Sequence, residues 1–187
     1  VGASGTTDWR KGSDLFARLA RAVYRARPER PVHFVWVGGS TEWRDAGMRA
    51  YDLERLGLLE FVHFIGPRRN PLDYYAAFDV FALVSREDPC PLVMLEAASL
   101  GKPILCFEES GGAPEFVGKE CGYAVPYGDL EGMAARALEL LRSPALREAM
   151  GRAGAERVRA RHDVSVTAPL ILAAMRRCMG LPGEAGG

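Results

Sequence analysis

The sequence predicts an α/β fold, a Rossmann-like doubly wound parallel sheet of about six strands. Short apolar runs alternate with longer stretches in which apolar residues recur at helical spacing, and most of the short runs end in glycine or polar residues. This alternation is typical of βαβ units, in which helices join parallel strands. Ligands of such sheets bind outside the carboxyl ends of the strands.

The expected elements follow one another along the whole chain. Strands are predicted at residues 1–3, 32–37, 61–65, 80–84, 103–107 and 122–126. Helices are predicted at residues 14–27, 48–56, 72–78, 91–100, 130–141 and 164–179. A short helix is expected to open at the Gly111-Gly112 turn, another to start at Ser143-Pro144, and Asp129 to be the N-cap of the helix at 130–141. We expect one domain over residues 1–180 and a flexible glycine-rich tail at 181–187.

Composition excludes several classes of protein. The chain has 187 residues, which suits one domain, and 24 basic side chains balance 24 acidic ones, so no overall charge favours nucleic acid. The four cysteines and three histidines show no metal-binding or disulfide spacing. No apolar run approaches the roughly 20 residues of a membrane span. We expect a cytoplasmic protein, free or peripheral at the inner membrane face.

The stretch from Ser85 to Ile104 is the most informative. It joins the strand at 80–84 to a helix that we expect to begin with Pro91 at its first position, where proline has no hydrogen bond to lose. The amides of Leu92 and Val93 would then be free donors at the positive end of the helix dipole. Such a helix start attracts phosphate.

Two carboxylates, Asp88 and Glu96, stand eight residues apart in this stretch. Both can face one crevice, separated by roughly 10 Å along the helix axis. The alternative is that Asp88 only caps the helix and Glu96 is solvated. The apolar neighbours of Glu96 favour the crevice, because buried carboxylates are rare without a partner.

The pattern Ser-x-x-Asp-x-x-x-Leu-x-x-Leu-Glu-Ala-x-x-x-Gly-x-Pro-Ile resembles the signature of glycosyltransferase family 4 (glycosyl transferases group 1). These are retaining enzymes of the GT-B fold, and the signature lies in their C-terminal, donor-binding half. The family motif has two glutamates separated by seven residues. Glu96 matches the second, which bonds the nucleotide ribose, and Asp88 stands at the first, near the donor sugar. Cys90-Pro91 replace the usual Phe-Gly.

Other segments share this resemblance. Lys11-Gly12 match the family pair whose lysine holds the donor diphosphate, and Arg10 is expected to substitute for an arginine that the family has at Ala3. A solvated loop lysine and glycines that merely end strands are the alternatives. The resemblance implies catalytic roles for Lys11, Arg10 and Asp88. It implies donor-binding roles for Gly38, Gly66, Pro67, Cys90, Pro91, Leu92, Val93, Glu96 and Gly112.

The resemblance implies transfer of a sugar from a nucleoside diphosphate to a glycan, lipid or small-molecule acceptor, with retention of configuration. The leaving phosphate would take the acceptor's proton, so neither a metal nor a cofactor is required. The abrupt start and short length predict that an N-terminal acceptor domain is absent, so the isolated chain should bind nucleotide but transfer little. No nucleic-acid partner is expected.

Two alternatives remain open. A sugar-nucleotide epimerase has the same overall fold and would release epimer or free sugar without an acceptor. A non-catalytic nucleotide-binding or scaffold module is suggested by Asp88 and Cys90-Pro91, which depart from the family pattern.

Overall fold

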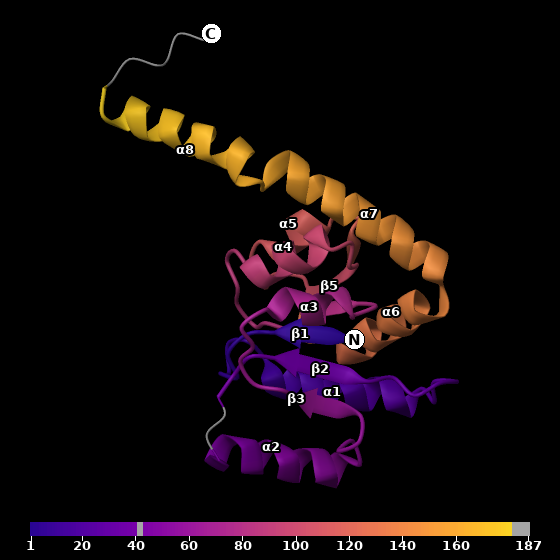
Figure 1. The fold of residues 1–187 in the computed structure, drawn as a ribbon. Helices are drawn as coiled ribbons and strands as arrows, with labels where there is room; N and C mark the ends of the chain where they lie inside the picture. The colour runs from indigo at the N-terminus through magenta and orange to yellow at the C-terminus, as the bar shows by residue number, and fades with distance from the viewer. Residues whose placement is uncertain (41–42, 181–187) are drawn as a thin grey trace.

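The computed structural model describes residues 1–40 and 43–180, and within that range side chains are described except at 43–46 (Figure 1). One six-stranded sheet has the order β3-β2-β1-β4-β5-β6, and every strand pair in it is parallel. The predicted doubly wound sheet is therefore confirmed. The predicted tail at 181–187 lies outside the described residues. The strands are β1 (Gly2–Ser4), β2 (Phe34–Val37), β3 (Val62–Phe64), β4 (Phe81–Leu83), β5 (Ile104–Phe107) and β6 (Gly122–Val125).

The helices follow the predicted order with shifted ends. The second begins at Trp43, five residues before the predicted start, because Gly47, a poor helix former, lies inside the helix and hides its beginning in the sequence. Asp129 caps the sixth as predicted, accepting a 2.8 Å hydrogen bond from the Gly132 amide. The helices are α1 (Ser13–Arg25), α2 (Trp43–Leu56), α3 (Pro71–Ala76), α4 (Leu92–Ser99), α5 (Ala113–Val117), α6 (Leu130–Arg142), α7 (Pro144–Arg161) and α8 (Val164–Cys178).

Two apolar layers cover the faces of the sheet. Helices α1 and α6 pack on one face, where they bury Phe16 and Met133 against strand residues such as Ala82. Helices α3, α4 and α5 pack on the other face, against Phe81 and Leu83. Neighbouring residues of β4 thus enter opposite layers, as the period of two in a strand requires. Because helices cover both faces of the sheet, a ligand can reach it at the ends of the strands, where the loops lie.

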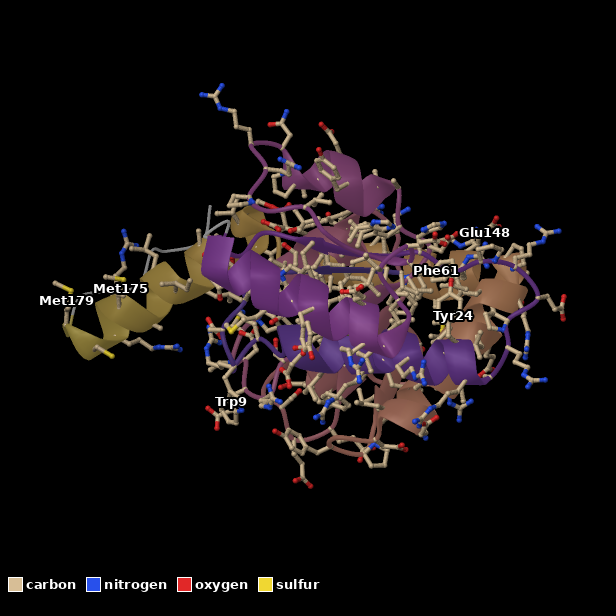
Figure 2. All side chains as sticks on the ribbon, turned by 90° about the horizontal axis from the view of Figure 1, so that it is seen from below. Trp9, Tyr24, Phe61, Glu148, Met175 and Met179 are labelled. Atoms are coloured by element: carbon tan, nitrogen blue, oxygen red, sulfur yellow. The ribbon has the colours of Figure 1, made fainter. Side chains whose placement is uncertain are left out.

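Helix α8 contributes nothing to these layers. Figure 1 shows it extending away from the sheet after α7, and none of its residues is buried. Met175 and Met179 lie at its outer end (Figure 2) and are 56% and 67% exposed. No helix among the described residues has both the length and the apolar character needed to cross a bilayer.

Candidate functional site

The candidate site lies where β1 and β4 run side by side in the middle of the sheet. The chain continues from β1 toward one edge of the sheet and from β4 toward the other, so the loops that follow these strands diverge. Such a switch point leaves a crevice at the carboxyl ends of the strands. The loop after β1 carries Arg10 and Lys11, and the loop after β4 carries Asp88.

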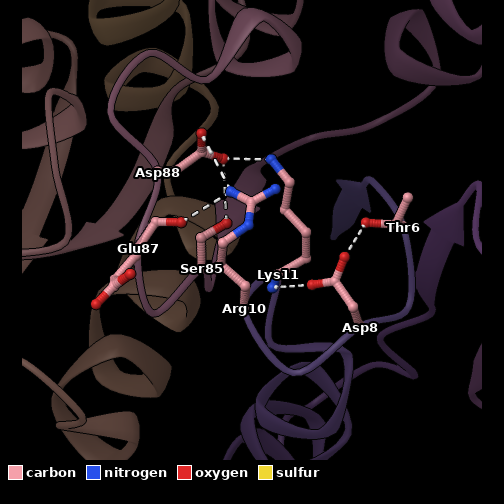
Figure 3. Close-up of polar contacts among 7 residues, drawn as sticks. All are labelled: Thr6, Asp8, Arg10, Lys11, Ser85, Glu87 and Asp88. Atoms are coloured by element: carbon pink, nitrogen blue, oxygen red, sulfur yellow. Dashed lines mark hydrogen bonds and ion pairs between the residues drawn. The ribbon is translucent and has the colours of Figure 1, made fainter.

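Lys11 and Asp88 form the central contact of this crevice (Figure 3). The lysine Nζ lies 2.5 Å from the Asp88 Oδ2, although the two residues are 77 positions apart in the sequence. Both side chains are largely buried, with 15% and 7% of their surface exposed. The Asp88 side chain caps no amide of α4, so the alternative that it serves only as a helix cap is wrong.

Arg10 brings a second cation to the same carboxylate. Its Nη1 lies 3.9 Å from the Asp88 Oδ1 and donates a 3.0 Å hydrogen bond to the Glu87 carbonyl (Figure 3). Its side chain remains 44% exposed. Two cations thus face one buried anion, so one of them can contact an incoming anion while the other stays beside Asp88.

The loop that carries these cations is held by internal hydrogen bonds. The Asp8 carboxylate accepts from the Thr6 hydroxyl at 2.5 Å and from the Lys11 amide at 3.0 Å (Figure 3). These bonds, that of Thr6 first, lower the pKa of Asp8. At the start of the same loop, the buried Trp36 indole donates to the Gly5 carbonyl at 3.0 Å. The backbone of Lys11 is therefore fixed before any ligand arrives.

Arg86, which the sequence analysis did not single out, ties the two loops together. Its guanidinium donates to both oxygens of Asp14, at 2.9 Å and 2.7 Å, and to the Trp9 carbonyl at 2.6 Å. It also stacks on the Trp9 ring, 4.8 Å from the centroid. The Arg86 amide donates to the Arg10 carbonyl at 2.8 Å. Only its place two residues before Asp88 in the sequence could have suggested this role.

The same guanidinium sets the acidity of Asp14. Its hydrogen bond and charge hold the pKa of that carboxyl below its ordinary value, despite partial burial. The paired form therefore persists at neutral pH, and the loops stay joined.

The start of α4 corrects one prediction. Pro91 is not the first helical residue but the residue before it, with an extended backbone at ψ 97°, and the helix begins at Leu92. Its carbonyl accepts from the Met94 amide at 3.0 Å. The amides of Leu92 and Val93 still have no intrahelical acceptor, as expected for the first two positions of a helix.

Glu96 lies one turn further along α4 and is half-buried. No described residue donates a hydrogen bond to its carboxylate or forms an ion pair with it. Its charge acts instead on Tyr75 of α3, where burial first and Glu96 second raise the pKa of the phenol. The structure does not place Glu96 in contact with the Lys11–Asp88 pair.

The remaining predicted residues fall into two groups. Gly38 and Gly66 meet at the carboxyl ends of β2 and β3, where the Gly38 amide donates to the Gly66 carbonyl at 2.9 Å, and Pro67 follows exposed. Cys90, Pro91 and Gly112 line a cavity of about 250 Å³, which Arg161 and His162 close from the end of α7.

Gly111 allows the loop that carries Cys90 and Pro91 to lie against the turn that carries Gly112. Gly111 has φ 125°, and a Cβ atom there would lie 2.1 Å from the Asp88 carbonyl. The Asp88 amide donates to the Ser110 carbonyl at 2.7 Å across this contact. The turn before α5 therefore packs directly on the backbone of Asp88.

Two further observations limit what the site can be. No group of three or more metal-ligating side chains occurs in the described parts of the chain. A cavity of about 930 Å³ lies near the amino ends of β1, β2 and β4, where Val1, His33 and Asp79 line it, far from the predicted residues. Arginines line this cavity too, but the buried Lys11–Asp88 pair and the free amides of α4 lie at the other ends of these strands.

Comparison with known proteins finds relatives among glycosyltransferases. A mannosyltransferase of Corynebacterium glutamicum, described as a GDP-mannose-dependent monoacylated alpha-(1-6)-phosphatidylinositol monomannoside mannosyltransferase, is 32% identical over 160 residues. That match covers 81% of this chain and 40% of the relative, so the chain spans less than half of the relative's length.

Two solved structures show the same fold. Anabaena HepE in complex with UDP matches 94% of this chain and 48% of its own, with a TM-score of 0.82 at 22% identity. The C-terminal domain of a Francisella tularensis glycosyl transferase group 1 family protein matches 87% of this chain and 86% of its own, with a TM-score of 0.74 at 22% identity.

A match to a family model identifies the family of this chain. The model of the family described as "Glycosyl transferases group 1" matches residues 1–143, which include every residue predicted for the site. The chain belongs to the glycosyl transferases group 1 family.

Proposed function

We propose that this chain is the donor-binding domain of a retaining GT-B glycosyltransferase of family 4. It would bind a nucleoside diphosphate sugar, and the complete enzyme would transfer the sugar to an acceptor with retention of configuration.

The observation that carries this proposal is the convergence of Lys11 and Arg10 at the carboxyl ends of β1 and β4. Cations fixed before the reaction stabilise charge that develops on a leaving diphosphate, because they need no reorganisation in the transition state. The free amides of Leu92 and Val93 add hydrogen-bond donors at a helix start. Losing one such donor slows catalysis by about 100- to 1,000-fold.

The roles of the carboxylates follow from their surroundings. Glu96 accepts no hydrogen bond from the described residues, so it is available for the ribose hydroxyls. Asp88 would orient the sugar once the diphosphate competes for Lys11, with Arg10 near enough to replace the lysine beside it. The acceptor would attack from the face that the diphosphate leaves, and the leaving phosphate would take its proton.

The acceptor site is proposed to lie in a second domain, because the chain covers only 40% of its mannosyltransferase relative. Glycan, lipid and small-molecule acceptors all remain within the proposal. The named relatives include a mannosyltransferase and a glycosyl transferase group 1 family protein, which favours neither the epimerase nor the scaffold alternative.

The proposal is tested by calorimetric titration of the chain with UDP, GDP and ADP. A related C-terminal domain has been solved on its own, which supports work with this chain alone. We expect one nucleotide to bind, and Lys11→Ala and Glu96→Ala each to weaken its affinity about tenfold or more, as loss of a charged hydrogen-bond partner requires.

Matched controls are Lys119→Ala and Glu148→Ala, which remove exposed charges from other parts of the molecule and should leave affinity unchanged. Because the proposed site uses side-chain cations, affinities in Mg²⁺ and in EDTA should agree within about twofold. Absence of binding by all three nucleotides would contradict the proposed function.

A further inference from the structure

Two histidines lie side by side on neighbouring strands of the sheet. His33 immediately precedes β2, and His63 belongs to β3, which is an edge strand. Val35 lies opposite His63 in this parallel pair, and His33 shares a face of the sheet with Val35 because side chains alternate along a strand. The proposed function uses neither histidine.

The two imidazole rings direct one nitrogen each toward the other. The Nδ1 of His33 lies 3.2 Å from the Nε2 of His63, and the rings are stacked, with centroids 5.4 Å apart and planes inclined by 22°. His33 is exposed and His63 is half-buried, so the pair lies at the surface of the molecule. A hydrogen bond between two imidazoles is one account of this contact, with one nitrogen as donor and the other as acceptor.

The distance also suits two ligands of a single metal ion. Zn–N bonds are about 2.0–2.1 Å long, so two imidazole nitrogens lie about 3.3–3.4 Å apart around a tetrahedral ion and about 2.9 Å apart at a right angle. The observed 3.2 Å falls between these values. Imidazole nitrogen is a preferred ligand of zinc, copper and nickel ions.

The backbone around His33 is fixed on both sides. The Tyr24 hydroxyl donates to the Val32 carbonyl at 2.9 Å and accepts from the Val32 amide at 3.0 Å. The Phe34 amide donates to the Phe61 carbonyl at 2.7 Å. The rings of Tyr24 and Phe61 pack with centroids 4.5 Å apart, and Figure 2 shows them together. An ion therefore meets two ligands that the fold already holds in place, which reduces the entropy cost of binding.

The protonation of the rings is compatible with metal binding. Burial first and the charge of His33 second lower the pKa of His63, which favours the neutral imidazole that metals bind. A neutral imidazole carries its single proton on either ring nitrogen. With the protons on the Nε2 of His33 and the Nδ1 of His63, both facing nitrogens present lone pairs, and no net proton has to leave.

We propose that His33 and His63 form a two-histidine site for a first-row divalent metal ion such as Zn²⁺, which joins the edge strand β3 to β2. This site goes beyond the proposed function and does not depend on it. Within residues 1–40 and 43–180 no group of three metal-ligating side chains forms, so water completes the coordination of the ion. Cu²⁺ should bind more tightly than Zn²⁺ or Ni²⁺, as is general for nitrogen ligands.

The test is calorimetric titration of wild type, His33→Asn and His63→Asn with Zn²⁺ alone at pH 7.5. We expect one ion per wild-type chain and at least about tenfold weaker binding in each variant, because each has lost a ligand. Zn²⁺ at about 100 times its dissociation constant should raise the unfolding temperature of wild type by about 5–10 °C, and that of the variants by about half as much or less. Thermal unfolding in EDTA verifies that each variant is folded.

Cu²⁺ distinguishes two ligands from one. The electron paramagnetic resonance spectrum of the Cu²⁺ complex should show coupling to two nitrogens in wild type and to one in each variant. His162→Asn, which replaces the remaining histidine of the chain, should bind Zn²⁺ as wild type does. The double variant Cys90→Ser, Cys178→Ser should do the same, because it removes only the two exposed thiols.

Three results would overturn the inference. Wild type that binds no Zn²⁺, or that keeps its affinity in both histidine variants, would show that the 3.2 Å contact is only a hydrogen bond between the imidazoles. Loss of Zn²⁺ binding on replacement of the two cysteines would assign the ion to the thiols. A wild-type Cu²⁺ spectrum with a single coupled nitrogen would exclude joint ligation by the two rings.

Discussion

Lys11 and Asp88 neutralise each other in the ligand-free chain, and this pairing has a consequence for binding. A buried ion pair that loses one partner leaves an uncompensated charge, which is costly. A diphosphate that takes Lys11 must therefore leave Asp88 with another cation. Arg10, at 3.9 Å and partly exposed, is placed to supply it.

At the same scale, Arg86→Ala should lower the free energy of unfolding by about 1–3 kcal/mol, because it removes charge-assisted hydrogen bonds to Asp14 and the Trp9 carbonyl. Arg86→Lys should recover only part of this, since an ammonium cannot make the two-pronged contact. Urea unfolding measures both. Arg152→Ala, which removes an exposed arginine of α7, should change stability by less than about 0.5 kcal/mol. Equal effects at positions 86 and 152 would contradict the assigned role.

His63 provides a prediction for pH. Its Nε2 lies 3.2 Å from the Nδ1 of His33, and burial first and the His33 charge second lower its pKa. The unfolded chain therefore binds a proton more readily than the folded one as pH falls through the ordinary histidine range near about 6.5. Stability should decrease between pH 7.5 and 5.5, and His63→Asn should make this decrease smaller. Urea unfolding of wild type and His63→Asn at both pH values measures this difference. An equal loss of stability in the two proteins would contradict the role assigned to the His33–His63 pair.

At the scale of elements, the packing of α7 on α4 depends on a close backbone approach. A Cβ atom at Gly151 of α7 would lie only 1.8 Å from the Gly101 carbonyl oxygen, which follows α4. Gly151→Ala should therefore destabilise the protein by about 1–3 kcal/mol or more, through overpacking.

Gly47→Ala is the matched control, since Gly47 also lies inside a helix but has nothing within 4 Å of an added Cβ atom. At Gly47 the higher helix propensity of alanine should raise the free energy of unfolding by about 0.5–1 kcal/mol. Thermal unfolding of the two variants should shift in opposite directions. A Gly151→Ala variant that unfolds at or above the wild-type temperature would contradict the close approach of α7 to α4.

At the scale of the whole molecule, α8 stands apart from the two apolar layers. It buries no residue, and Val164, Leu170 and Ile171 are 75%, 66% and 60% exposed. A chain that ends at residue 163 should unfold within about 3 °C of the complete chain, because it loses little buried area.

A chain that ends at residue 142 is the contrasting variant. It also lacks α7, with the buried Met150, Gly151, Gly154 and Ala155, and should unfold at a clearly lower temperature. If removal of α8 alone lowers the unfolding temperature as much, then that helix contributes to the fold in a way that its exposure does not indicate.

Local patterns in the sequence determined the elements, because strand and helix periods depend on residues only two to four positions apart. The capping of α6 by Asp129 and the existence of strand β4 followed from such patterns. The carboxyl-edge location of Lys11, Asp88 and the α4 amides also followed, since in a parallel sheet every strand–loop–helix connection opens at that edge.

Only the tertiary structure decided which side chains meet. The Lys11–Asp88, Arg86–Asp14 and Tyr75–Ser4 contacts each join positions about 70 or more apart, and no local period encodes them. Pro91 shows the same limit within one turn. Its fixed φ suits both the first helical position and the residue before it, so local chemistry left the choice open. The structure has the extended ψ, in a loop whose Pro89 carbonyl lies against Gly112 from a distant part of the chain, and packing between distant segments can outweigh a local preference of this size.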